Sequence, residues 1–270
     1  MSYNKFDIIP AASFSDIGLK MVPPLRCLSS WVQCLWANDG SKSNPQRVEE
    51  KLYPDAGSSL TFEIRNTEIK ARYFHHTRVF AHRWDLSTKH ISVRFRAGGA
   101  RALLGLDIDD LQNIEIDLLD TAFPQRSSLQ LLMDTLPALS TTQQIEAVQN
   151  WLLTLSCRAQ EPHYKWSTLL ARASTDLIPP QQLALQNGLS RRTLERQLRK
   201  YLGFTPNQLH RFAQIRKARQ HLIMTPDSLS DIALACGYFD QAHFTNAFRE
   251  QALETPLQYR QRKMSQISNS

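Results

Sequence analysis

The side chains best suited to chemistry lie in the last third of the chain, where basic and amide residues recur at helical spacing. Residues 190–220 carry nine Lys and Arg side chains and one acid. Arg, Gln, His and Asn can hydrogen-bond the edges of DNA bases, and Lys and Arg neutralise phosphates. The pattern favours a polyanionic partner, double-stranded DNA, although a solvated helix face is the alternative. The cations are Arg191, Arg192, Arg196, Arg199, Lys200, Arg211, Arg216, Lys217 and Arg219, and the acid is Glu195.

The charge is divided unevenly along the chain. The 270 residues carry a net charge of +7. Residues 165–270 hold 15 basic and 7 acidic side chains, whereas residues 1–164 hold 17 and 18. A chain of this length can form two domains that each bury a core. The basic excess therefore belongs to the second domain.

Apolar runs in the sequence are far shorter than a membrane span, and the N-terminal MSYNKFDIIP lacks a basic region followed by an apolar core. We therefore expect a cytoplasmic protein with no membrane partner. Cys27, Cys34, Cys157 and Cys236 are scattered without a C-x-x-C pair, so they indicate neither a zinc site nor a disulfide framework. No cofactor is expected.

Two segments of the second domain repeat each other. LALQNGLSRRTLERQLRKYLGFTP (183–206) aligns with IALACGYFDQAHFTNAFREQALETP (232–256), with one residue added in the turn. Gly188 and Gly237 occupy the same place, where the chain must turn sharply with a positive φ. Each copy is predicted to be a short helix, a tight turn and a second helix.

Both second helices begin at an N-cap, Ser190 in one copy and Asp240 in the other. An apolar residue before each cap is expected to pack onto one inside the helix, as a hydrophobic staple. A third cap of this kind is predicted at Ser230. The staples pair Leu189 with Leu194, Phe239 with Phe244, and Leu229 with Leu234.

Apolar pairs spaced by four residues fix which side of each second helix faces the core. Leu194 and Leu198 do so in the first copy, and Phe244 and Phe248 do so in the second. The remaining side chains must face outward, where they can enter a major groove. They are Arg191, Arg192, Glu195, Arg196 and Arg199 in the first copy, and Gln241, Ala242, His243, Asn246 and Arg249 in the second.

Residues 206–223 join the copies and contain no helix breaker after Pro206, which takes the first helical position. A single helix of this length measures about 25 Å at 1.5 Å per residue. Such a rod can hold two recognition helices about one DNA turn, roughly 34 Å, apart. One motif alone could equally be a helical hairpin with a solvated face, but two copies beside clustered cations favour DNA recognition.

The stretches LALQNGLSRRTLERQL and DIALACGYFDQAHFTNAFRE, with the later PLQYR, resemble the DNA-binding domain of the AraC/XylS family of bacterial transcription regulators. The resemblance implies a seven-helix domain whose two recognition helices enter adjacent major grooves. A small-molecule effector, RNA polymerase and a second copy of the chain are further candidate partners. The resemblance places base contacts on Arg192, Glu195, Arg196, Gln241, His243 and Asn246, and phosphate contacts on Lys200 and Arg249.

Two features depart from the family pattern. Leu253 stands where the first copy has Gly203 as a helix C-cap. A non-glycine residue in the left-handed conformation costs about 1 kcal/mol, so the last turn could close differently. The second motif is also nearly neutral, which predicts a smaller contribution to affinity than that of the first.

The N-terminal part is predicted to be mainly strand. SSLTFEI (58–64), IKARYFH (69–75) and HISVRF (90–95) are short, rich in β-branched and aromatic residues, and bounded by turns. RCLSSWVQCLW (26–36) and NIEIDLL (113–119) are expected to add strands, and a small barrel or sandwich is the natural closure. The tract is similar to a sensor-like domain found in one branch of the AraC/XylS family, which implies a cupin-like unit.

The predicted fold class is α+β, with a β-rich N-terminal domain and an all-α C-terminal domain. The predicted divisions are a sensor-like domain at 1–123, a helical linker and candidate dimerisation segment at 124–160, and a DNA-binding domain at 161–270, with helix-turn-helix motifs at about 181–201 and 229–251.

Strand alternation places Arg94 and Arg96 on the same side as His90 and Ser92. The two guanidinium groups could clamp an anionic effector, although a solvated sheet face is the favoured alternative. His75, His76, His82 and His90 could suggest a metal site. Their spacing lacks an H-x-H pair with a later Glu and His, so we expect structural histidines and no metal.

Apolar side chains in the helical linker, Trp151, Leu152, Leu155 and the run 131–133, either form a dimer interface or pack against the chain's own sheet. The sequence contains no G-x-S-x-G elbow, P-loop or H-E-x-x-H motif, so no enzymatic activity is expected. The leading hypothesis is a transcription regulator that reads two adjacent major grooves and is modulated by an effector that binds the N-terminal domain. The alternative is a small-molecule-binding or metal-dependent β-barrel enzyme with an accessory DNA-binding tail.

Overall fold

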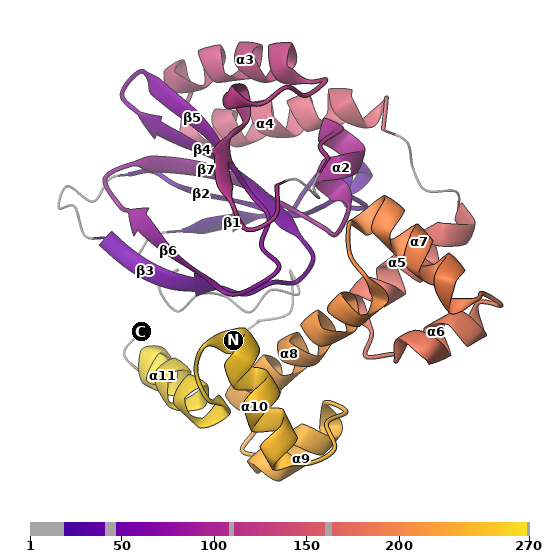
Figure 1. Ribbon diagram of the computed structural model, residues 1–270. Helices are drawn as coiled ribbons and strands as arrows, with labels where there is room; N and C mark the ends of the chain where they lie inside the picture. Colours follow the sequence, from indigo (N-terminus) through magenta and orange to yellow (C-terminus); the bar gives the residue numbers. More distant parts are fainter. Residues whose placement is uncertain (1–18, 41–46, 108–110, 160–163, 269–270) are drawn as a thin grey trace.

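The computed structural model describes residues 19–40, 47–107, 111–159 and 164–268. A β-rich N-terminal domain lies above a helical C-terminal domain, as Figure 1 shows, and the predicted α+β class is confirmed. None of the described helices is long and apolar enough to cross a membrane.

The N-terminal domain is built on an antiparallel sheet with the strand order β1-β2-β7-β4-β5-β8, faced by a separate pair, β3 and β6. The central strands are rich in Val, Ile, Phe and Leu, which suits a pleated surface covered on both sides. The strands span Lys20–Val22 (β1), Val32–Asn38 (β2), Arg47–Leu52 (β3), Ser58–Arg65 (β4), Glu68–Phe74 (β5), Phe80–Asp85 (β6), Lys89–Phe95 (β7) and Glu115–Asp117 (β8).

Two helices, α3 (Arg126–Thr135) and α4 (Thr141–Ser156), lie across one face of the large sheet (Figure 1). Their apolar side chains form a single core with the sheet residues Leu35, Phe62 and Val93. Trp151 and Leu152 are 7% and 0% exposed in that core. Most of the apolar side chains proposed for a dimer interface therefore pack on the chain's own sheet, and only Leu131 of that set is largely exposed, at 69%.

The opposite face of the large sheet carries aromatic and histidine rings that contact the β3–β6 pair. Trp84 packs edge-on against Trp36, with ring centroids 5.0 Å apart, and against His90 at 5.4 Å. His90 and Ser92 are 2% and 0% exposed. The prediction that they lie on a solvated sheet face is wrong, because β6 covers the side on which they lie.

The sequence did not predict every strand of the N-terminal domain correctly. Residues 26–28 form a 3-10 helix, η1 (Arg26–Leu28), and β2 begins only at Val32, so the predicted strand over 26–36 starts too early. Strands β1, β3 and β6 were not predicted. The tract 99–112 contains a short helix, α2 (Gly99–Leu104), and residues 108–110 of that tract lie outside the described part of the chain.

Seven helices make up the described part of the C-terminal domain, the number that the family resemblance implies. The longest, α8, runs between two helical clusters (Figure 1). Its first half packs into the core of the first cluster and its second half into that of the second. The helices are α5 (Tyr164–Thr175), α6 (Pro180–Gln186), α7 (Arg191–Leu202), α8 (Pro206–Met224), α9 (Leu229–Ala235), α10 (Gln241–Ala252) and α11 (Pro256–Ser268).

The two domains touch each other at both ends of α8. At the first cluster, Gly98 lies so close to α7 that a Cβ atom there would stand 2.4 Å from the carbonyl oxygen of Tyr201. At the second cluster, the Tyr53 hydroxyl donates to Glu254 Oε1 at 2.8 Å, and the Arg219 guanidinium lies 3.6 Å from the Tyr53 ring centroid. The N-terminal domain is thus docked on both halves of the helical domain.

Candidate nucleic-acid interface

The first candidate recognition helix, α7, has one apolar and one charged side. Leu194 and Leu198 are fully buried, as their spacing predicts. The Ser190 hydroxyl accepts from the Thr193 backbone N–H at 3.1 Å, so the predicted N-cap is confirmed. The opposite side carries one acid, Glu195, which is partly buried, and five exposed cations. The cations are Arg191, Arg192, Arg196, Arg199 and Lys200.

The second candidate recognition helix, α10, repeats this arrangement with less charge. Phe244 and Phe248 are fully buried. The Asp240 carboxylate caps the helix by accepting from the His243 N–H at 2.7 Å. The outward side chains are exposed, and they are Gln241, Ala242, His243, Asn246 and Arg249.

The turn of each motif has the geometry that its glycine predicts. Gly188 and Gly237 have φ values of 62° and 77°, in the region that L side chains rarely adopt. Leu253 also takes a left-handed conformation, with φ 56°, and its N–H donates to the Arg249 carbonyl. The last turn of α10 therefore closes like that of α7 at Gly203, despite the missing glycine.

Two details of the predicted caps are wrong. The N-cap of α9 is Ser228, whose hydroxyl accepts from the Asp231 N–H at 3.1 Å, and Ser230 instead hydrogen-bonds Gln241 at 2.8 Å. Leu234 and Phe239 are 65% and 84% exposed, so neither forms its predicted staple. In the second cluster, the ring of Tyr238 packs against Phe244, at a centroid distance of 5.2 Å.

The predicted cluster of nine cations serves two different purposes. On α8, the Lys217 ammonium donates to the Ala235 carbonyl at the end of α9, at 2.6 Å, and Arg216 donates to the Thr175 carbonyl at the end of α5, also at 2.6 Å. Cations are favourable at helix C-termini, where carbonyl groups lack partners. Arg219 stacks on Tyr53. Lys217 and Arg216 thus hold helices together and Arg219 contacts the sheet domain, which leaves α7 as the main basic surface.

Some outward side chains are held in place before any partner binds. The Arg199 Nε donates to Glu195 at 3.1 Å, one helical turn away, and Arg249 donates to Asn246 Oδ1 at 3.4 Å. Exposed pairs of this kind contribute little to stability. They do reduce the number of conformations that the side chains sample, which favours a defined contact pattern.

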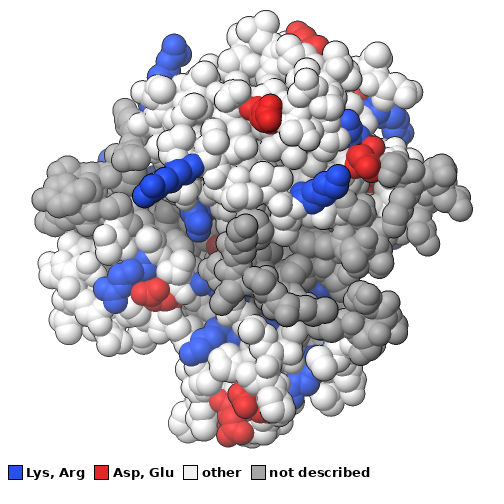
Figure 2. All heavy atoms as spheres, turned by 180° about the vertical axis from the view of Figure 1, so that it is seen from behind, with Lys and Arg blue, Asp and Glu red and all other residues white. Residues whose placement is uncertain are grey.

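Lys and Arg side chains on the back of the molecule, in contrast, are scattered and mixed with Asp and Glu (Figure 2). The face shown there offers no continuous basic track among the residues it displays.

The two arginines predicted to clamp an effector do not act together. Arg94 forms a close ion pair with Asp55 and donates to the Ser59 hydroxyl at 3.0 Å, so its charge is already neutralised inside the domain. Arg96 is exposed, and its Nε donates to the Ser29 carbonyl at 2.9 Å. Strand alternation could not predict that only Arg94 is paired, because its partner Asp55 lies in the connection between β3 and β4.

The four histidines of the sheet region are buried or half-buried among aromatic rings. His76 stacks on Phe80 at 4.5 Å, and His82 lies 4.2 Å from Trp84. Burial lowers the pKa of His75, His76 and His90 to about 4, with a smaller contribution from neighbouring positive charges. Among the described residues, no group of three or more His, Cys, Asp and Glu side chains is arranged to hold a metal ion.

Two family models match separate parts of this chain. One described as "Helix-turn-helix domain" matches residues 183–262. Another described as "Domain of unknown function (DUF6597)" matches residues 20–117. The first match covers α7 and α10 with the helices around them, and the second covers the sheet.

Similar proteins match through the helical domain. The HTH-type transcriptional activator RhaS of Klebsiella pneumoniae (strain 342) is 38% identical over 81 residues, which make up 30% of this chain and 29% of the relative. RhaS of Enterobacter sp. (strain 638) is 41% identical over 73 residues, covering 27% and 26%. The chain thus matches less than a third of the length of these relatives. A transcriptional regulator with an AraC-type DNA-binding domain from Chromobacterium violaceum has 32% identity, covers 36% of this chain and 85% of its own, and gives a TM-score of 0.30.

The fold and the exposed polar sides of α7 and α10 define a double helix-turn-helix domain. In this domain the chain is similar to HTH-type transcriptional activators, as its resemblance to the AraC/XylS family implies.

Proposed function

We propose that this protein is a transcription regulator that binds double-stranded DNA in a sequence-specific way, with α7 and α10 in two adjacent major grooves. The observation that carries the proposal is the pairing of two capped helices, each exposing its polar side, on one continuous helix. The relatives that match this domain are named as HTH-type transcriptional activators.

The length of α8 supports the spacing that two grooves require. Its 19 residues correspond to about 28 Å at 1.5 Å per residue. With the widths of the flanking helices, the two recognition helices can reach sites one DNA turn apart, about 34 Å. Because α8 contributes to both helical cores, the two motifs cannot rotate freely about it.

The roles of individual side chains follow from their chemistry. We assign base contacts to Arg192, Glu195 and Arg196 on α7 and to Gln241, His243 and Asn246 on α10. Arg suits the O6 and N7 acceptors of guanine, and Asn and Gln suit adenine. Arg249 and Lys200 are assigned to phosphates, and α7 contributes most of the electrostatic affinity because α10 is nearly neutral.

Selection of bound sequences from random duplexes with the full chain tests this proposal. We expect two short conserved blocks whose centres lie about 10 base pairs apart. The variant Arg196→Ala should lose base preference within one block, and Asn246→Ala should lose it within the other. The matched control is Arg78→Ala, an exposed arginine in the sheet domain. Failure to enrich any sequence, or identical blocks from all four proteins, would contradict the proposal.

The alternative function, a metal-dependent or small-molecule-processing enzyme with a DNA-binding tail, lacks a specific observation in its favour. The histidines that suggested it pack against aromatic rings instead of converging on one point. Metal analysis of the purified protein separates the two proposals, because the enzyme requires a stoichiometric ion held by these side chains.

A further inference from the structure

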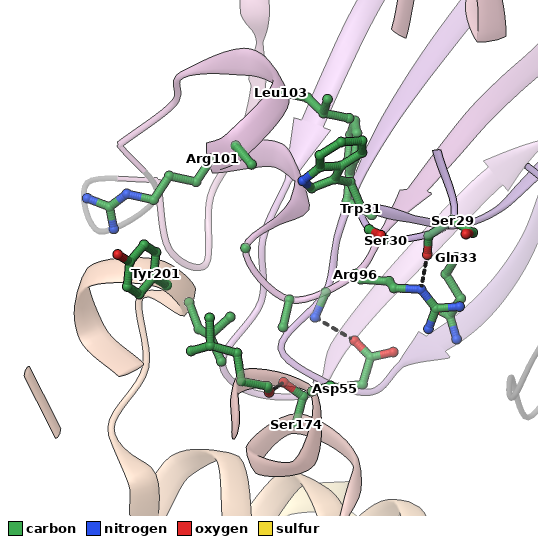
Figure 3. Close-up of a pocket in the computed structure, with 18 of the residues that line it drawn as sticks. Ser29, Ser30, Trp31, Gln33, Asp55, Arg96, Arg101, Leu103, Ser174 and Tyr201 are labelled. Atoms are coloured by element: carbon green, nitrogen blue, oxygen red, sulfur yellow. Dashed lines mark hydrogen bonds between the residues drawn. The ribbon is translucent and has the colours of Figure 1, made fainter. Parts of the chain in front are cut away.

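A cavity of about 900 Å³ lies between the two domains. One wall comes from the sheet domain, with Trp31, Arg96 and Arg101, and the other comes from the helical domain, with Ser174 and Tyr201 (Figure 3). Pockets for small molecules have volumes of roughly 300–1,000 Å³ and often lie at domain boundaries. The cavity therefore has the size and position of a ligand site.

The charge of the cavity walls is strongly one-sided. Five cationic side chains line it and come from both domains, whereas the single lining carboxylate, Asp55, is paired with Arg94 and accepts from the Gly57 N–H at 2.9 Å. Cations gathered in a concave site raise the local concentration of anions. The five are Arg96, Arg101 and Arg158, with Lys200 and Arg216 from the helical domain.

Apolar surface accompanies these charges. The Trp31 ring lies near Leu103 in Figure 3. Leu155, Leu170 and Leu202 add aliphatic surface from the helices. A site of this composition suits an organic anion, whose charged groups meet guanidinium forks while its carbon framework covers the apolar wall.

We propose that this interdomain cavity binds a small organic anion that carries at least two carboxylate or phosphate groups. Several cations at separate points of the wall favour multiple charged groups over one. DNA is a less suitable occupant of the cavity itself, because a duplex is far larger than a pocket of this volume.

Binding there reaches a recognition helix directly. Lys200, Tyr201 and Leu202 are the last residues of α7, and all three line the cavity. Arg101 donates to the Arg199 carbonyl of the same helix at 3.4 Å. A ligand held between Arg96 and Lys200 thus connects the sheet domain to α7. Its role as an effector of DNA binding rests on the proposed function, whereas its binding does not.

Titration calorimetry of the full chain with pyrophosphate and with citrate, at fixed ionic strength, tests the binding. We expect one site for at least one probe, and the active probe distinguishes phosphorylated ligands from polycarboxylates. Arg96→Gln and Lys200→Gln should each weaken binding about tenfold, because each removes one charge-assisted contact. The control Arg78→Gln, an exposed position that does not line the cavity, should bind as the wild type does.

Absence of binding by both probes, or equal loss in the control variant, would overturn the proposal. These outcomes are independent of the DNA selection, because calorimetry contains no DNA. A protein that selects DNA sequences but binds neither probe retains its proposed function and loses only this site.

Discussion

At the residue scale, Leu253 shows that a repeated backbone geometry can survive without the residue that favours it. Its φ of 56° repeats the conformation of Gly203, and its side chain is 67% exposed. A side chain in this region costs about 1 kcal/mol, and here little burial offsets that cost. The neighbouring turns, with the aromatic core around Phe248 and Tyr259, hold the backbone in place.

We therefore expect Leu253→Gly to raise the free energy of unfolding by about 1 kcal/mol, the strain of a side chain at this φ. Urea denaturation measures the difference. The matched control is Leu131→Gly, because Leu131 is equally exposed at 69% but lies inside helix α3. That change should lower stability by about 1 kcal/mol. A loss of stability at both positions would show that Leu253 makes a contact that outweighs its strain.

If Arg249 contacts a DNA phosphate, its removal should change the salt dependence of binding. Arg249→Gln should weaken binding to all DNA sequences alike and reduce the slope of log affinity against log salt by about one. Binding titrations at several salt concentrations measure this slope. Arg196→Ala provides the contrast, since it should change base preference. A changed preference in Arg249→Gln would instead place that side chain on a base edge.

At the element scale, the contact between the large sheet and the β3–β6 pair depends on rings that must stay uncharged. His76 is 7% exposed and stacks between Phe74 and Phe80, at centroid distances of 5.4 and 4.5 Å. Burial, and to a lesser degree the charge of Arg94, lowers the pKa of His76 to about 4. The unfolded chain therefore binds a proton at this histidine more readily than the folded chain.

The sign of the pH effect follows from this difference. Stability is complete above the ordinary histidine pKa of about 6.5, falls as the pH drops towards 4, and loses no more below that value. His76→Phe keeps the ring stack and cannot be protonated. We expect a smaller loss of stability between pH 7 and 5 in this variant, measured by urea denaturation at each pH. Equal losses in both proteins would mean that His76 does not contribute.

At the scale of the whole molecule, a buried carboxylate joins the two domains. Glu254 receives hydrogen bonds from Tyr53 and Arg262, each at 2.8 Å, and lies 3.2 Å from the Lys51 ammonium. Burial alone raises the pKa of Glu254, but these partners outweigh it and lower the pKa to about 2. Lys51 and Tyr53 belong to the sheet domain, so the ionised carboxylate favours docking.

We expect Glu254→Gln to lower the free energy of unfolding at pH 7, because the amide keeps the shape but loses the charge that its partners require. The contribution is present above the ordinary glutamate pKa of about 4.3 and disappears as the pH falls through 2. The difference between the two proteins should therefore shrink in acid. Glu250→Gln, at an exposed position of α10, is the control and should change stability little.

Much of the helical domain was predictable because its determinants are local. N-caps, turn glycines and apolar spacing act within a few residues, so Ser190, Gly188 and the pair Leu194 and Leu198 indicated the first motif from the sequence. The failures there were also local: Ser228 competes with Ser230 for the same helix start, and only the packed turn decides between them.

The sequence by itself determined that two capped helices recur on a helical rod, because those signals are short-range and repeated. Only the tertiary structure decided which cations remain outside, that β3 and β6 cover the polar face of β7, and where the domains enclose a cavity. Each of these depends on contacts between residues distant in the chain. The partner of Arg94, or the carbonyl that holds Lys217, is fixed by packing and leaves no periodic signal in the sequence.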